Sequence, residues 1–197
     1  MGIVIGIDVG ISTTKIVGIV EQGKVLSPIR IKATDPVTSL YGAFGKFLYV
    51  NKIQLQDIEK VMLTGVGSAY INEPIYNLPT EKAEEFIADG LGARYETKLD
   101  RMIVVSMGTG TSIVKCDGED IKHIGGIGIG GGTLQGLSRL LLKTDDILQV
   151  SKLAEEGDVA HINLLIKDIS AKPLPGLPMD AIASLCGNAK SNASRED

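Results

Sequence analysis

Acidic, basic and hydroxyl side chains gather in one short segment near the start of the chain, GIDVGISTTK at residues 6–15. Small residues there would let backbone N–H groups approach a polyphosphate closely. Lys15 can neutralise phosphate charge, and Asp8 can hold a hydrated Mg²⁺ ion. An ordinary tight hairpin with a solvated lysine is the competing interpretation, and this segment alone does not separate the two.

The segment GTGTS at residues 108–112 repeats this chemistry in the second half of the chain. A single turn of this kind is weak evidence, because an ordinary Gly-rich turn has the same composition. Two such turns at corresponding places, however, predict a clamp whose backbone N–H groups hold a phosphate chain from both sides. The pair therefore favours a phosphate site over two unrelated turns.

Glycine is concentrated in GGIGIGGGT, residues 125–133, directly before an expected helix over residues 132–143. Part of this segment matches the GxGxxG fingerprint of dinucleotide-binding folds. It does not follow the first strand, and no strand–helix–strand unit surrounds it, so that interpretation is weak. A Gly loop that presents phosphate to the N-terminus of a helix is favoured. The alternative is close packing of helix and strand that simply requires glycine.

Two consecutive acids, Glu84 and Glu85, lie in an expected helix over residues 80–97, which starts with a capping-box pattern at Thr80. Phosphoryl transfer to an alcohol requires a carboxylate near the hydroxyl group, to orient it and accept its proton. Acidic residues on a helix more often form a solvated face. From the residues alone, the solvated face is the better interpretation of this pair.

The elements that would position these groups follow from hydrophobic periodicity and from Gly and Pro punctuation. Asp35 and Pro36 provide an N-cap and a first helical residue. The strand–turn–strand pattern occurs twice, which suggests an internal duplication with halves at residues 1–98 and 99–197. Strands are expected at residues 3–9, 14–21, 24–33, 58–64, 101–106, 112–116 and 121–124, and helices at 37–50, 80–97, 132–143 and 145–156.

Composition excludes several classes of protein. The chain has 197 residues, 44% of them hydrophobic, and a formal net charge of −4. These values favour a folded core and disfavour nucleic acid or an anionic membrane as the main partner. Only two cysteines and two histidines occur, so a zinc site is not expected and the pattern is typical of a reduced cytosolic protein. No apolar run approaches the ~18 residues of a membrane span.

Taken together, the segments GIDVGISTTKIV, EEFIADGLG, SMGTGTSIV, HIGGIGIGGGTLQGLS and PLPGLPMDAIAS resemble the type II pantothenate kinases. These belong to the acetate/sugar kinase, Hsp70 and actin superfamily. The resemblance runs along the whole chain, and the combination is specific although each loop alone is shared across the superfamily. It implies an α/β, ribonuclease H-like duplicated fold, with two halves around an ATP cleft and the second half incomplete.

The resemblance also implies roles for individual residues. Glu85 falls on the Glu of the family's E-F-x-A pattern and becomes the general base, with Glu84 as a reserve candidate. Ser112 and His123 are expected at pantothenate, and Asp8 at Mg²⁺. The residues expected at the ATP phosphates and the nucleotide are Asp8, Gly10, Ile11, Ser12, Thr13, Lys15, Thr109, Gly130, Gly131, Gly132, Thr133, Leu134 and Gln135.

Two departures from the family pattern bear on these expectations. Some members have an Arg where this chain has His123, and histidine cannot match a bidentate, permanently charged fork. Family members also continue past the position of Asp197, so the chain is expected to lack part of the nucleotide pocket and of a dimer interface.

The resulting hypothesis is a cytoplasmic, homodimeric enzyme that uses ATP and Mg²⁺ to phosphorylate pantothenate. This is the first step of coenzyme A biosynthesis, and coenzyme A thioesters are candidate inhibitors. Neither nucleic acid nor a membrane is an expected partner. Two alternatives stay open: a catalytically silent kinase-fold module that binds nucleotide or a partner, and a kinase for another small hydroxyl substrate such as an amino sugar.

Overall fold

The computed structural model describes residues 2–20, 23–33, 35–191 and 193–197. Contacts divide the chain into two units, residues 1–130 and residues 131–197, and each is described by itself. The sequence predicts an internal duplication with halves at residues 1–98 and 99–197. The division by contacts does not test that duplication, so these two halves stay a prediction.

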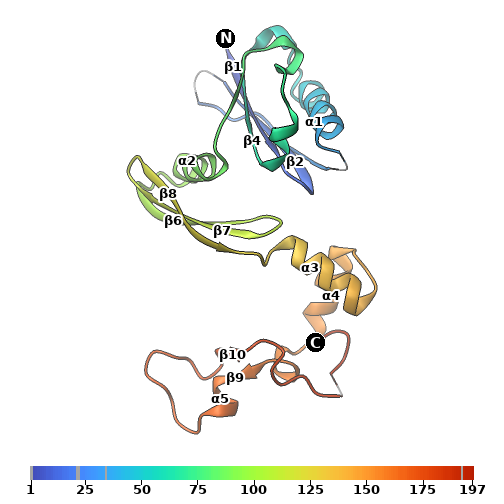
Figure 1. Ribbon diagram of the computed structural model, residues 1–197, viewed down its shortest axis with the longest axis vertical. Coiled ribbons are helices and arrows are strands. Elements are labelled where there is room, and N and C mark those ends of the chain that lie inside the picture. Colours follow the sequence, from blue (N-terminus) through green and yellow to red (C-terminus); the bar gives the residue numbers. More distant parts are fainter. Residues whose placement is uncertain (1, 21–22, 34, 192) are drawn as a thin grey trace. The chain divides into compact units, whose positions relative to one another are not determined.

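A five-stranded sheet forms the centre of the first unit (Figure 1). Its strands, in spatial order, are β3 (Ile29–Lys32), β2 (Thr13–Val20), β1 (Ile3–Val9), β4 (Ile58–Thr64) and β5 (Thr80–Lys82). The first three strands along the chain form an antiparallel meander, whereas β4 and β5 run parallel to β1. Both edges of β1 are therefore paired, which fixes the strand that carries Asp8.

Helix α1 (Pro36–Asn51) covers one face of this sheet. The helix begins as the sequence predicts, because the Asp35 carboxylate accepts a 2.6 Å hydrogen bond from the Thr38 N–H. Phe44 and Phe47 are fully buried in the same core cluster as alternate residues of β1, such as Ile5. Burial of each such aromatic side chain contributes about 1.5–3 kcal/mol. The hydrophobic core thus lies on this one face and leaves the opposite face of β1 to other uses.

A second, antiparallel sheet follows with the order β6 (Arg101–Met107), β7 (Thr111–Asp117) and β8 (Asp120–Ile127). It repeats the meander of the first three strands. Helix α2 (Glu85–Thr97) packs on this sheet through Gly90, where a Cβ atom would lie 2.6 Å from Ile121 Cγ2 and 3.1 Å from Cys116 Sγ. The small residue therefore sets how closely α2, with Glu85 at its start, approaches the sheet.

Three predicted elements differ from the structure. The expected helix over residues 80–97 begins only at Glu85, because residues 80–82 form β5 alongside β4. The Thr80 hydroxyl accepts from the Ile75 N–H and donates to the Leu78 carbonyl oxygen, so it does not cap the helix. The expected strand over residues 24–33 is regular only at Ile29–Lys32, since Pro28 has no N–H to donate to a ladder. The expected helix over residues 132–143 changes to a π-helical turn halfway.

The second unit is built from short elements. They are α3 (Gly131–Leu137), the π-helical turn Ser138–Leu142, α4 (Ile147–Glu156), β9 (Leu164–Leu165), α5 (Ile166–Ile169) and β10 (Ile182–Ser184). The Ser138 hydroxyl donates to the Leu134 carbonyl oxygen at 2.7 Å, a local bond that competes with the helical ladder where α3 ends. Short 3₁₀ helices lie in the first unit at Leu55–Asp57, Val66–Tyr70 and Ile75–Asn77, and in the second unit at Val159–His161.

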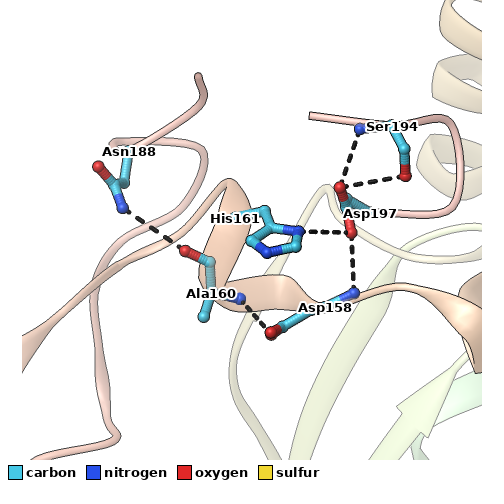
Figure 2. Close-up of polar contacts among 6 residues, drawn as sticks. All are labelled: Asp158, Ala160, His161, Asn188, Ser194 and Asp197. Atoms are coloured by element: carbon cyan, nitrogen blue, oxygen red, sulfur yellow. Dashed lines mark hydrogen bonds and ion pairs between the residues drawn. The ribbon is translucent and has the colours of Figure 1, made fainter. Parts of the chain in front are cut away.

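Asp197 holds the last residues of the second unit in place (Figure 2). One carboxylate oxygen accepts from the Asp158 N–H at 2.9 Å and lies 3.1 Å from His161 Nδ1. The other accepts from the N–H and the hydroxyl of Ser194. Because the backbone donors of Ser194 and Asp158 favour the ionised form, the pKa of Asp197 lies well below its usual range. Among the described residues, no helix is long and apolar enough to cross a membrane.

Two glycines of α2 provide a matched test of this packing. We expect Gly90→Val to lower the free energy of unfolding by about 2 kcal/mol, because its side chain would overlap Ile121 and Cys116. Gly92→Ala in the same helix should raise it by about 0.5–1 kcal/mol, since a Cβ atom there meets nothing within 4 Å. Urea denaturation measures both. Equal effects of the two substitutions would contradict the close approach at Gly90.

Candidate phosphate and acceptor site

The β1–β2 hairpin brings Asp8 and Lys15 together. The two residues are direct partners in the antiparallel register, and Lys15 Nζ lies 2.7 Å from Asp8 Oδ2. The side chains keep 27% and 52% of their exposure, so both remain accessible to a ligand. This pair is the arrangement of acid and base that the sequence predicts at the end of the first strand.

The turn between these strands is tight and open to solvent. The Gly10 N–H donates to the Thr13 carbonyl oxygen at 3.1 Å, and a Cβ atom at Gly10 would lie 2.7 Å from that oxygen. Ile11 is 68% exposed and Ser12 is also exposed. The predicted phosphate residues 10–13 therefore close one turn, with Ile11 and Ser12 exposed at its tip, and its closed shape depends on glycine at its start.

Glu85 is the first residue of α2, and its charge interacts with this hairpin. Partial desolvation raises the pKa of Glu85, and the negative charges of Asp8 and Asp89 raise it further. Lys15 acts in the opposite direction and lowers the pKa. The candidate base and the candidate phosphate residues thus share one electrostatic environment, although about 70 residues of sequence separate them. Glu84, the reserve candidate, is the N-cap residue of α2.

The GTGTS turn lies between β6 and β7, at the place that corresponds to the first hairpin. Ser106 and Ser112 are register partners as Asp8 and Lys15 are, and the Gly108 N–H donates to the Gly110 carbonyl oxygen at 2.8 Å. Thr109 is exposed at the tip of the turn. Ser112 pairs across to Gly126 in β8, so the expected acceptor residue lies in the sheet itself.

At two positions of the Gly-rich segment there is no room for a Cβ atom. A Cβ atom at Gly126 would lie 2.6 Å from the Thr111 carbonyl oxygen, and one at Gly130 would lie 2.7 Å from two carbonyl oxygens of the GTGTS turn. Close approach to β7 and to the β6–β7 turn, rather than packing between helix and strand, therefore requires glycine at these two positions. Gly125 and Gly128 would meet nothing within 4 Å, so packing does not explain them. Gly130 belongs to the first unit, whereas Gly131, Gly132, Thr133, Leu134 and Gln135 begin the second.

His123 lies in β8 and stacks on Phe86, the residue after Glu85. The ring centroids are 4.2 Å apart and the planes are inclined by 16°. One face of the imidazole is therefore covered by an aromatic ring. The stack ties the start of α2 to the second sheet, and it places the expected acceptor residue His123 beside the neighbour of the candidate base.

Sequence reasoning missed three residues around these groups. The sequence places Phe86 only within the E-F-x-A pattern and Arg30 only within the expected strand over residues 24–33, and it gives Gly65 no role. Gly65 has a φ of 83°, and a Cβ atom there would lie 2.4 Å from Asp8 Oδ1. The turn after β4 can therefore approach the Asp8 carboxylate only with glycine at this position. The signal was a glycine directly after a buried strand parallel to β1.

The residues present fit a magnesium ion but not a closed metal cage. Among the described residues, no group of three or more His, Cys, Asp or Glu side chains could hold a metal ion. Mg²⁺ in phosphoryl-transfer sites is commonly held by one or two carboxylates together with phosphate oxygens and waters. Asp8, beside the exposed turn, supplies one such carboxylate.

Comparisons with known proteins agree on one family and one fold. The Fumble family profile matches residues 92–197. The type II pantothenate kinase of Staphylococcus aureus strain USA300 is 33% identical over 189 residues, which cover 93% of this chain and 66% of that relative. The chain thus spans slightly less than two thirds of that relative's length.

Two solved structures show the fold. Component A of the (R)-2-hydroxyglutaryl-CoA dehydratase from Acidaminococcus fermentans matches with a TM-score of 0.66 and 13% identity, over 84% of this chain and 62% of that chain. The activator of the 2-hydroxyisocaproyl-CoA dehydratase from Clostridium difficile, with bound ADPNP, matches with a TM-score of 0.63 and 15% identity. That match covers 79% of this chain and 57% of that one. The chain has the mixed α/β fold of actin, Hsp70 and the sugar kinases, as the sequence predicts.

The shared environment of Glu85 can be measured directly. We expect Asp89→Asn to lower the pKa of Glu85, because it removes a negative charge, and Lys15→Gln to raise it, because it removes a positive one. Carboxyl ¹³C NMR titration, with the Glu85 signal assigned from Glu85→Gln, measures both shifts.

Asp100→Asn provides a control that should leave the titration of Glu85 in place, since Asp100 is not among the charges that shift it. A pKa of Glu85 that moves with neither Asp89 nor Lys15 would show that the hairpin and the start of α2 are electrostatically separate.

Proposed function

Because the chain belongs to the Fumble family, we propose that it transfers the γ-phosphoryl group of ATP to the primary hydroxyl of pantothenate. The observation that carries this proposal is the shared electrostatic environment of Asp8, Lys15 and Glu85. A phosphate-neutralising cation, a magnesium-binding carboxylate and a base are the groups that phosphoryl transfer to an alcohol requires. The 33% identity to a type II pantothenate kinase supports pantothenate as the acceptor.

In the proposed reaction, the hydroxyl oxygen of pantothenate forms a bond to the γ-phosphorus of ATP. The bond from that phosphorus to the oxygen shared with the β-phosphate breaks, so the products are phosphopantothenate and ADP. The hydroxyl proton passes to a Glu85 carboxylate oxygen. A base is most effective when its pKa lies near the working pH, and the pKa of Glu85 is raised in that direction.

Charge on the transferring group is the second requirement. Lys15, at 2.7 Å from Asp8, can turn its ammonium group toward phosphate oxygens because half of its side chain remains exposed. Asp8 would hold Mg²⁺, which when bound supplies further neutralisation of phosphate charge. On binding, Asp8 would exchange its contact with Lys15 for the metal ion. Lys15 would exchange its contact with Asp8 for the phosphate oxygens of the nucleotide.

The remaining assignments belong to the same proposal. Thr109 would lie near the nucleotide, Ser112 and His123 at pantothenate, and Gly130 to Gln135 along the phosphates. A homodimer, a cytoplasmic location and inhibition by coenzyme A thioesters are proposed on the family relationship.

Substitution of the base tests the proposal. We expect Glu85→Gln to lower the rate of phosphopantothenate formation about 10²-fold to 10⁴-fold, because the amide cannot accept the proton. Mass spectrometry of a mixture with Mg-ATP and pantothenate measures the product, and equilibrium dialysis with labelled ATP shows that nucleotide binding remains. The parent rate should fall as the pH drops through the raised pKa of Glu85, since the protonated carboxyl is not a base.

Glu96→Gln, an exposed substitution in the same helix, should retain the parent rate. A large loss in Glu84→Gln with none in Glu85→Gln would transfer the role of base to Glu84. A parent protein that binds ATP and phosphorylates another hydroxyl compound, but not pantothenate, would contradict the acceptor. Nucleotide binding with no transfer to any acceptor would favour a binding module.

A further inference from the structure

The start of helix α2, which carries the proposed base Glu85, lacks the usual side-chain cap. Glu84 is the N-cap residue, and among the residues that the structure describes its carboxylate accepts no capping hydrogen bond. The first N–H groups of a helix have no partners within the helix, so a helix without a cap is held less firmly at its start. A base must nevertheless lie within hydrogen-bond reach of the proton that it accepts. Other contacts therefore have to fix this turn.

Two contacts, one with each sheet, hold the chain on either side of Glu85. Before it, the Ala83 N–H donates to the Leu63 carbonyl oxygen of β4 at 2.7 Å. After it, the Phe86 ring stacks on the His123 ring of β8, with centroids 4.2 Å apart and planes inclined by 16°. The first contact joins the chain to the five-stranded sheet and the second joins it to the three-stranded sheet. Glu85 therefore lies between two anchors.

A bulge in β8 sets His123 and Gly126 on the same face of the second sheet. The pairing of β8 with β7 skips Ile124, so His123 pairs with Val114 while Gly126 pairs with Ser112. Residues two apart on a strand share a face, and a bulge commonly re-aims a side chain. A Cβ atom at Gly126 would lie 3.6 Å from His123 Nε2. The imidazole therefore extends from the start of α2 toward the strand position that pairs with Ser112.

Core packing does not account for Phe86. Phenylalanine is among the residue types that are most often fully buried, as Phe44 and Phe47 are in the core cluster of this protein. Among the described residues, Phe86 is only partly buried and lies outside that cluster, and its partner His123 is exposed. A stack of two accessible rings directly after the proposed base is better explained by the position that it gives to Glu85.

We propose that Phe86 and His123 are a pair of positioning residues for Glu85, because their stack fixes the rotation of the first turn of α2. This inference rests on the proposed function and deepens it. Rotation of that turn would move the carboxylate relative to Asp8 and Lys15, whose charges act on it. A misplacement of about 1 Å can lower a rate about 10²-fold. The stack uses one face of the imidazole, so this role is compatible with a contact between His123 and the acceptor.

Steady-state kinetics separate positioning from acceptor binding. In Phe86→Leu, which removes the stack, we expect kcat to fall about 10-fold to 100-fold while KM for pantothenate stays within about 3-fold. In His123→Phe, which keeps two stacked rings but no ring nitrogens, kcat should stay within about 3-fold. In His123→Leu, kcat should fall as in Phe86→Leu. The variant that combines Phe86→Leu with His123→Leu should lose no more in kcat than either single variant, because both break the same contact.

A titration measures the position of Glu85 without turnover. Lys15 lowers the pKa of Glu85, so Lys15→Gln should raise it in the parent protein. In the Phe86→Leu background we expect Lys15→Gln to raise this pKa by less than about half as much, because the carboxylate then lies farther from the ammonium group. Carboxyl ¹³C NMR measures both shifts.

Tyr95→Leu is the matched control. It also removes an aromatic ring from α2, but from the last turns of the helix, where the Tyr95 hydroxyl donates to the Gly23 carbonyl oxygen. In this variant kcat should stay within about 2-fold of the parent value and the titration of Glu85 should be unchanged. Thermal unfolding checks that each variant is folded. If Phe86→Leu does not fold, His123→Leu carries the test, because His123 is exposed.

Three outcomes would overturn the assignment. A kcat that changes in neither Phe86→Leu nor His123→Leu would exclude positioning by the stack and leave the proposed function intact. Equal losses in His123→Phe and His123→Leu would show that the imidazole acts on the reaction directly. An equal loss in Tyr95→Leu would reduce the effect to a general loosening of α2. A parent protein that forms no phosphopantothenate would instead contradict the proposed function, and the titration would still test the position of Glu85.

Discussion

The pairing of β1 with β2 is the constraint on which the site depends. It sets Asp8 opposite Lys15, closes the exposed turn between them and aligns both with Thr64 and Arg30 on the flanking strands. Both side chains of the ion pair are partly exposed, and such pairs contribute little to stability. The buried face of the same strands holds the hairpin in place, where Ile5 and Ile16 pack under α1. A shift of one residue in this register would exchange the two faces and bury the charges.

The two faces of β1 thus have different roles in the first unit. One face supplies the apolar contacts that α1 covers, and the other carries Asp8 and Gly6 and lines a cavity of about 500 Å³. Helix α2 then links this open face to the second sheet. Gly90 packs against β7 and β8, and the charges of the hairpin shift the pKa of Glu85 at the start of the helix. The proposed base is therefore positioned by a short helix that packs on the second sheet.

Much of this arrangement could be predicted from local sequence. Strong alternation and clear punctuation located β1, β2, β4 and α1, and the Asp35 cap was readable from two residues. The helix start predicted at Thr80 was wrong. A Thr before acidic residues is a capping pattern, and only the pairing with β4 shows that Thr80 lies in a strand. The place of Arg30 beside Lys15 and the approach of Gly65 to Asp8 could not be predicted, because they depend on register and on contacts between distant segments. The roles given to individual residues remain proposals that rest on the family relationship.

A crystal structure of this protein with Mg²⁺, a non-hydrolysable ATP analogue and pantothenate tests most directly whether the β1–β2 hairpin and the start of α2 form one site. We expect the γ-phosphate at the exposed turn beside Lys15, with the magnesium ion at Asp8. We also expect the pantothenate hydroxyl within about 2.6–3.2 Å of the Glu85 carboxylate. A nucleotide bound away from the β1–β2 turn, or a hydroxyl beyond the reach of Glu85, would contradict the claim that hairpin and helix form one site.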